Sequence, residues 1–201
     1  MRDFQSAAAA GAAIAVGAAA YLSCSNQIVG AFLFSVALFT ICVLNLNLYT
    51  GKVGYFFETT EKAAIAVTWL GNLTGGVIAA LLLRLAKPEL TERVSLLIQG
   101  KMGQNPLQTA ILAMFCGMMM YIAIHNYRYH KSDLHRVLGI VLCIMAFIIC
   151  GFEHSIADMC YFTLYVHSWP TFGYAACYIL LVTLFNGVGA TLYRLLTRGN
   201  I

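Results

Sequence analysis

Ionisable side chains inside an apolar stretch mark the residues of this chain that could do chemistry. Glu153, His154 and Asp158 interrupt a hydrophobic segment that runs from about Val137 to Val166. A charged group at membrane depth costs about 2.5–3.5 kcal/mol by insertion scales, so such groups face a water-filled cavity or a polar partner. Gly151 stands just before them, where a helix can break. A broken membrane helix with ionisable residues at the break is typical of a transport site.

His154 is the centre of this hypothesis. An imidazole has an unperturbed pKa of about 6.5, so it exists in both charge states near neutrality and can offer a proton or a hydrogen bond to a solute. The alternative is that His154 only caps a broken helix.

The two acids beside His154 leave more than one interpretation. Glu153 is expected to fix the break by bonding backbone or a neighbouring helix, or else to tune the histidine. Asp158 lies four residues after His154 and therefore on a similar helical face. That face would be directed toward the inner half of a pore or toward an interface.

Composition places the chain in the membrane class. Of its 201 residues, 61% are hydrophobic and 10% are charged, against about 25% charged in soluble domains. The net charge is +4, but the basic residues form no run, so a nucleic-acid partner is not expected. The seven cysteines form no CxxC pair and are interpreted as buried thiols, without a metal site. No phosphate loop or nucleotide fingerprint is present, so coupling to ATP hydrolysis is not expected. We expect a protein that is not an enzyme and needs no cofactor.

Six stretches are apolar enough to cross a bilayer, which takes about 20 residues. The second and fifth are too long for one plain span, and both are interrupted, at Asn45–Gly51 and at Gly151–Ser155. The longest polar connection runs from about Lys87 to Asn105. We therefore expect an all-α membrane protein with six spans and broken second and fifth helices, forming one domain over residues 1–201. The stretches are roughly 4–23, 26–58, 61–85, 106–127, 134–167 and 171–196.

The two halves of the chain, roughly 4–85 and 106–196, repeat the same features. Each contains a plain helix, a broken helix and a helix with Asn-x-x-Gly, at Asn72–Gly75 and Asn186–Gly189. Three spans per half is an odd number, so the halves insert with opposite orientations as an inverted repeat. Asn72 and Asn186 are expected to bond the exposed backbone of the breaks, which hydrocarbon cannot satisfy. Direct contact with a permeant is the other possibility.

The basic residues predict the orientation. Cytoplasmic segments carry an excess of Lys and Arg. With the N-terminus inside, the inner segments hold eight of these residues and the outer segments four. This favours a multi-pass protein of the inner (cytoplasmic) membrane with both termini in the cytoplasm. The inner residues are Arg2, Lys52, Lys62, Arg128, Lys131, Arg136, Arg194 and Arg198, and the outer ones are Arg84, Lys87, Arg93 and Lys101.

Three segments match one known membrane family. Gly151–Ala157 (GFEHSIA) is nearly its signature, and Leu48–Gly51 and Gly71–Gly76 support the match. On these residues the chain resembles the formate/nitrite transporter family almost from end to end. The resemblance implies an aquaporin-like fold and a homopentamer with one pore per protomer in the lipid bilayer. It also implies passage of small monovalent anions or their conjugate acids, such as formate, nitrite and hydrosulfide.

The resemblance also implies which residues line the pathway. The threonine of the broken second helix falls on Thr50, the histidine of the broken fifth helix on His154, and an asparagine of the sixth span on Asn186. The lysine of the outer vestibule falls on Lys101, where a cation would concentrate anions; an ordinary surface lysine is the other reading. Apolar constrictions reject hydrated ions by dewetting, and these fall on Phe34, Leu38, Leu48 and Phe147, with Tyr49 beside them.

Two positions depart from the family pattern. Gly117 stands where the fourth span usually carries an asparagine, and Asp158 stands where the signature usually ends in Asn-Met. Formate or nitrite is the leading substrate, with hydrosulfide as the alternative in the same class. A haem-binding redox subunit is the alternative of another class, but it needs histidines paired across helices, and His154 alone lies deep in a span. A water or glycerol channel is disfavoured because twin Asn-Pro-Ala motifs are absent.

Overall fold

The computed structural model describes residues 1–166 and 168–198, and its regular structure is helical. Within these ranges, four helices are long and apolar enough to cross a membrane. Residue 167 of the predicted fifth stretch, and residues 199–201 of the predicted domain, lie outside the described residues. The four helices are α1 (Arg2–Ser23), α4 (Lys62–Ala86), α6 (Pro106–Tyr129) and, over Pro170–Thr197, α9 (Trp169–Thr197).

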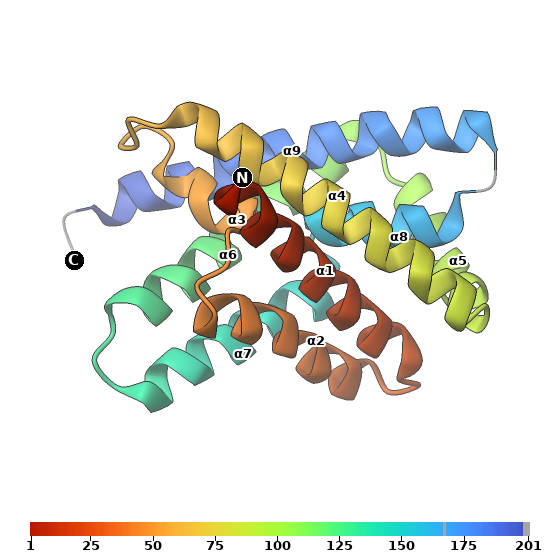
Figure 1. Ribbon diagram of the computed structural model, residues 1–201, viewed down its shortest axis with the longest axis horizontal. Helices are drawn as coiled ribbons and strands as arrows, with labels where there is room; N and C mark the ends of the chain where they lie inside the picture. Colours follow the sequence, from red (N-terminus) through yellow and green to blue (C-terminus); the bar gives the residue numbers. More distant parts are fainter. Residues whose placement is uncertain (167, 199–201) are drawn as a thin grey trace.

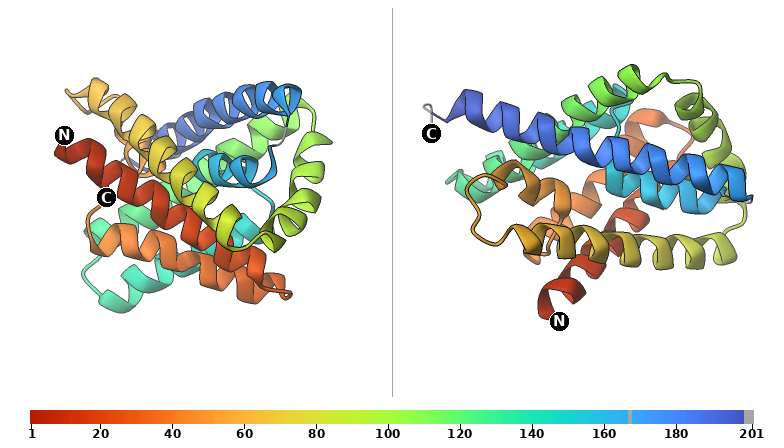
Figure 2. Two further views of the ribbon diagram at one scale, coloured as in Figure 1. Left: turned by 45° about the vertical axis from the view of Figure 1, so that its right-hand side comes forward. Right: turned by 90° about the horizontal axis from the view of Figure 1, so that it is seen from above.

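The helices pack in pairs. α1 packs along α4, and the two cross the molecule side by side in Figure 1. α6 packs along α9, which runs along most of the molecule in Figure 2. Two shorter helices, α2 (Gln27–Val43) and α7 (Asp133–Ile149), pack against each other. Helices α2, α4, α7 and α9 each expose large apolar side chains, among them Phe32, Leu82, Leu142 and Leu184. An apolar exterior of this kind suits a lipid environment rather than water.

Glycine permits the close approach within each long pair. A Cβ at Gly75 of α4 would overlap the carbonyl oxygen of Ala8 in α1. A Cβ at Gly189 of α9 would overlap the carbonyl oxygen of Met114 in α6 in the same way. Small residues at such crossings let helix backbones touch, the main source of helix association in a membrane.

Gly117 of α6 is a third such contact, and it explains one departure from the family pattern. A Cβ there would overlap the carbonyl oxygen of Asn186, so the backbone leaves no room for an asparagine. We expect Gly117→Ala to destabilise the protein by about 1–3 kcal/mol through overpacking, measured as a lower Tm in detergent. Gly173→Ala is the matched control, since a Cβ there meets nothing within 4 Å. Equal Tm values for both variants would contradict the packing role of Gly117.

At two places in the chain, one helix ends and another begins after a break of five residues. α2 ends at Val43 and a short helix, α3 (Tyr49–Lys52), begins beyond residues 44–48, followed by a 3-10 turn, η1 (Val53–Tyr55). α7 ends at Ile149 and α8 (Ser155–Tyr165) begins beyond residues 150–154. The sequence placed these breaks one to three residues later along the chain.

The two helix ends close in the same way. Each is followed by a residue of left-handed backbone, Asn45 (φ 51°) and Gly151 (φ 66°). The next amide then donates to a carbonyl in the last turn of the helix, over 2.8 Å from Leu46 and 2.9 Å from Phe152. This is the Schellman pattern, which favours Gly or Asn because few side chains tolerate a positive φ.

A further helix, α5 (Glu89–Met102), lies within the polar connection from Lys87 to Asn105, where the sequence had predicted no helix. Its buried residues Leu90, Val94 and Ile98 recur every fourth position, and Glu89 and Glu92 occupy its first turn. That spacing is typical of an amphipathic helix. α5 packs on α8 and thereby brings the end of the connection to the second break.

Candidate functional site

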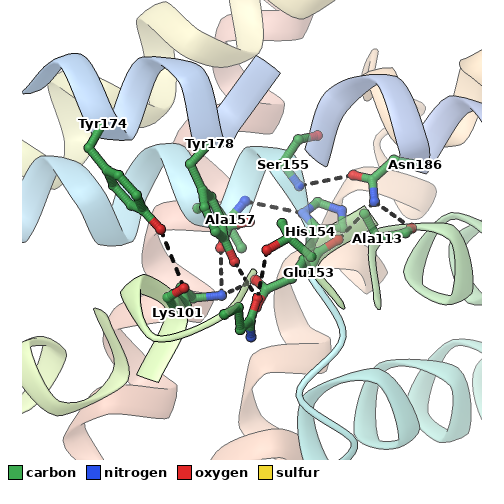
Figure 3. Close-up of polar contacts among 12 residues, drawn as sticks. Lys101, Ala113, Glu153, His154, Ser155, Ala157, Tyr174, Tyr178 and Asn186 are labelled. Atoms are coloured by element: carbon green, nitrogen blue, oxygen red, sulfur yellow. Dashed lines mark hydrogen bonds and ion pairs between the residues drawn. The ribbon is translucent and has the colours of Figure 1, made fainter. Parts of the chain in front are cut away.

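The two breaks meet at Thr50 and His154. Thr50 lies on α3, and His154 is the residue that precedes α8. Thr50 Oγ1 lies 3.1 Å from His154 Nε2, and the two residues are only 1% and 2% exposed. His154 Nδ1 accepts a hydrogen bond of 3.1 Å from the Ala157 amide (Figure 3).

These contacts determine how the ring is protonated. Because Nδ1 is an acceptor, the neutral ring carries its hydrogen on Nε2 and donates it to Thr50 Oγ1. The Thr50 hydroxyl hydrogen is then left to be donated to a third group. A second proton on His154 would have to go to Nδ1 and would break the bond from Ala157. His154 thus caps α8, as the alternative interpretation holds, and it also makes a second contact that a cap does not require.

Aromatic rings cover the imidazole. Phe147 stacks on His154 with ring centroids 5.7 Å apart and an interplanar angle of 27°. Phe34 meets Phe147 edge to face at 5.8 Å. Leu38 of α2 is buried in the same hydrophobic core as Phe34 and Phe147. All three residues were predicted as constrictions, and the ring of Phe147, backed by Phe34, gives the imidazole of His154 an apolar cover.

The other two predicted constriction residues lie elsewhere around the break. Leu48 precedes α3 and lines a cavity of about 50 Å³ together with Gly51 and Arg128. Tyr49 is turned away from His154: its hydroxyl donates to the Thr183 carbonyl of α9 over 3.1 Å.

Asn72 ties α3 to its neighbours. Its Oδ1 accepts a hydrogen bond of 2.8 Å from the Tyr49 amide, the first of α3. Its Nδ2 donates to the carbonyls of Ala7 (2.8 Å) and Asn47 (2.9 Å). An amide hydrogen at a helix start has no partner within the helix. Asn72 supplies that partner, which is why α3 begins at Tyr49 and not after Gly51.

Asn186 makes the corresponding contacts at the second break. Its Oδ1 accepts a hydrogen bond of 2.9 Å from the Ser155 amide, the first of α8, and its Nδ2 donates to the carbonyls of Ala113 and Glu153, both over 2.8 Å. The side-chain amides of Asn72 and Asn186 therefore both bond to backbone groups, which is the contact expected of them. Direct contact of Asn186 with a permeant is not what these bonds favour.

Lys101 lies in a buried ion cluster, which we define as Lys101, Glu153 and Asp158. The lysine is 9% exposed; its Nζ pairs with Glu153 Oε2 and lies 2.9 Å from Asp158 Oδ1. Burial lowers the pKa of Lys101, but the carboxylates of Asp158 and Glu153 raise it more, so its pKa lies above the ordinary value. Lys101 is thus not a surface lysine, and a buried cation whose charge is balanced by acidic partners provides no positive field to concentrate anions.

The cluster also decides where the two acids lie. Asp158 pairs with Lys101 of α5 and its side chain is only 1% exposed, so it is buried within the protein. The side chain of Glu153 links the second break to Lys101 of α5 and also to Gln104, which lies just beyond α5 and donates to Oε1 over 2.9 Å. Sequence reasoning missed Gln104. Its only signal was its place directly before the Asn105-Pro106 helix start.

Comparison with known proteins supplies the family. The model of the formate/nitrite transporter family matches residues 1–198. The chain belongs to this family. As a formate/nitrite transporter family member with an apolar exterior, it is a multi-pass membrane protein.

Two curated members of the formate/nitrite transporter family are similar to this chain over part of their length. It is 28% identical to the nitrite transporter NirC of Salmonella typhimurium over 149 residues, 68% of this chain and 54% of that protein. It is 28% identical to the formate channel FocA of Escherichia coli over 156 residues, 66% of this chain and 52% of that protein. The chain thus spans about half the length of the curated relatives it matches.

Two solved structures share the fold. A pentameric formate channel with formate bound superposes with a TM-score of 0.82 at 20% identity, covering 99% of this chain and 96% of that one. A second ion channel of the family gives a TM-score of 0.81 at 23% identity, covering 98% and 87%.

Proposed function

We propose that this chain forms a homopentameric channel or transporter that passes small monovalent weak-acid anions, with formate or nitrite as substrate, past Thr50 and His154. The observation that carries the proposal is the buried hydrogen bond between these two residues, made where two helix breaks meet under the ring of Phe147. The relatives named as a nitrite transporter and a formate channel support this substrate class.

The geometry supports a mechanism in which His154 stays neutral. Its Nε2–H and the Thr50 hydroxyl form a short line of donors in an apolar setting, where each hydrogen bond to an anion is stronger than in water. A permeant anion accepts the hydrogen of Thr50 and is stabilised by the His154 donor behind it. The proton that neutralises the permeant comes from water, because a second proton on His154 would cost the Ala157 bond.

The proposed topology has six spans. α2 with α3 forms one broken span and α7 with α8 the other, and the matching ties of Asn72 and Asn186 support an inverted repeat. Lys101 precedes α6, whose 24 residues span about 36 Å, and Arg128 lies in the last turn of that helix. We place the Arg128 end, and both termini, in the cytoplasm.

Two alternatives remain distinguishable. Hydrosulfide would use the same pathway as a smaller weak acid with fewer hydrogen-bond acceptors. A haem subunit needs a histidine nitrogen as ligand. Both ring nitrogens of His154 already make hydrogen bonds, so the structure does not favour it.

The proposal predicts a specific flux profile in liposomes. Formate and nitrite should cross at rates that rise as the pH falls, while chloride, which forms no neutral acid at these pH values, should cross at least tenfold more slowly. The measurement compares formate, nitrite, hydrosulfide and chloride at several pH values, with protein-free liposomes as the control for simple diffusion of the acids. Chloride flux equal to formate flux, or no flux of any of the four, would refute the proposed function.

A further inference from the structure

We propose that the buried ion cluster of Lys101, Glu153 and Asp158 is a proton-binding site, in which Asp158 carries the proton, and that release of this proton impedes anion entry. The second half of this proposal rests on the proposed function, whereas the first half does not. Asp158 is also the position at which the signature departs from its usual asparagine.

Charge balance is the first argument. The cluster contains one ammonium and two carboxyl groups, and the side chains of Lys101, Glu153 and Asp158 are 11%, 2% and 1% exposed. If both carboxyl groups were ionised, the cluster would carry one uncompensated negative charge. An unpaired buried charge costs several kcal/mol, which protonation removes. One bound proton leaves Lys101 paired with one carboxylate and makes the cluster neutral.

The hydrogen bonds indicate which acid holds the proton. Glu153 receives a donor on each oxygen, from Lys101 on Oε2 and from Gln104 on Oε1. A carboxylate needs such donors, since it can only accept hydrogen bonds. Asp158 has Lys101 beside Oδ1, but its buried Oδ2 has no hydrogen-bond partner. Glu153 is therefore the ionised member and Asp158 the protonated one.

The surroundings add no second cation in contact with the cluster among the residues that the structure describes. The rings of Tyr161 on α8 and Tyr178 on α9 each lie 6.0 Å from Lys101 Nζ, and Tyr178 donates to Gln104 Oε1 over 3.1 Å. These phenols are neutral near pH 7. Further titratable groups on elements around α8 include Tyr21 of α1, Arg84 of α4 (bonded to the Val166 carbonyl), Arg93 of α5 (bonded to the Leu22 carbonyl), Cys116 of α6, His154 and Cys160 at and on α8, and Tyr174 of α9.

The sign of the functional effect follows from the charge. With its proton, the cluster is neutral. Without it, the cluster carries one net negative charge on the side chains of Glu153, which directly precedes His154, and Asp158, which follows it by four residues. A negative charge in a buried setting raises the energy of an approaching anion. Lower pH therefore favours entry in two ways. It protonates the cluster, which removes the repelling charge, and it protonates the permeant itself.

Infrared spectroscopy tests the first half without reference to transport. In reconstituted wild type, we expect the C=O stretch of a protonated carboxylic acid to disappear as the pH is raised. Asp158→Asn and Glu153→Gln should each abolish this band, since either change leaves one carboxylate for Lys101. Glu92→Gln, an exposed acid on α5, is the matched control and should keep the band. Loss of the band from either cluster variant suffices, should the other fail to assemble.

Flux measurements on the same samples test the second half. The ratio of Asp158→Asn flux to wild-type flux should rise several-fold as the pH passes through the range in which the band titrates. Absence of a titrating band in wild type, or its persistence in both cluster variants, would overturn the proton site. A flux ratio that is constant with pH would overturn the entry effect. If wild type passes no weak acid, the proposed function fails, while the band still decides whether Asp158 binds a proton.

Discussion

Replacing His154 by asparagine is expected to lower formate and nitrite flux by about 10- to 100-fold while leaving the protein assembled. The estimate follows from losing a hydrogen bond to a charged group, about 1.5–3 kcal/mol. Asparagine is a good N-cap residue, so its side chain can still accept from the Ala157 amide. It is too short to replace Nε2, which lies 3.1 Å from Thr50 Oγ1. The measurement is the initial rate of flux in liposomes at several pH values.

Two further variants complete this test. His154→Phe removes both the cap and the donor, so it should lose flux and also assemble less well. Thr50→Val keeps the shape of the side chain but removes the hydroxyl, and should lose flux without affecting the cap. Wild-type flux and pH dependence in His154→Asn would show that His154 serves α8 alone and would remove the basis of the proposed mechanism.

The helix breaks could be predicted because their signals are local. Gly151 and the polar residues after it interrupt an apolar stretch, and Asn45 does the same in the first half. Where each helix begins again could not be read in this way. It depends on Asn72 and Asn186, which reach the first amides of α3 and α8 from distant parts of the chain. The predicted boundaries were therefore off by up to three residues.

The polar contacts of Lys101 were beyond sequence reasoning for a related reason. The sequence shows a lysine in a polar connection, and a solvent-facing role is the default for such a residue. Its burial requires that α5 forms and packs on α8, which carries Asp158. The amphipathic spacing of Leu90, Val94 and Ile98 was visible and could have predicted α5. The pairing of Lys101 with Glu153 and Asp158 could not have been predicted, because it depends on tertiary packing.

Lys101→Met should be the most destabilising of the substitutions considered. It leaves Glu153 and Asp158 without their cation, and breaking a buried ion pair by removing one partner costs about 3–5 kcal/mol. We expect a large loss of assembled protein and a lower Tm at neutral pH. The defect should shrink as the pH falls, because protonation removes the uncompensated charges. Lys87→Met is the matched control, since Lys87 and its partner Glu89 are 53% and 58% exposed and such pairs contribute about 0–1 kcal/mol.

Rescue distinguishes this account of Lys101 from the anion-concentrating role that the family resemblance implied. Combining Lys101→Met with Glu153→Gln and Asp158→Asn replaces all three ionisable groups by neutral ones, so the triple variant should regain much of the lost stability. A lysine that only concentrated anions would give a different result. Lys101→Met would then assemble like wild type and raise the apparent KM at low ionic strength, and the difference would vanish at high salt, where the Debye length falls to about 3 Å. Stability and salt dependence thus give opposite results for the two roles, and the burial of Lys101 between two carboxylates favours the first.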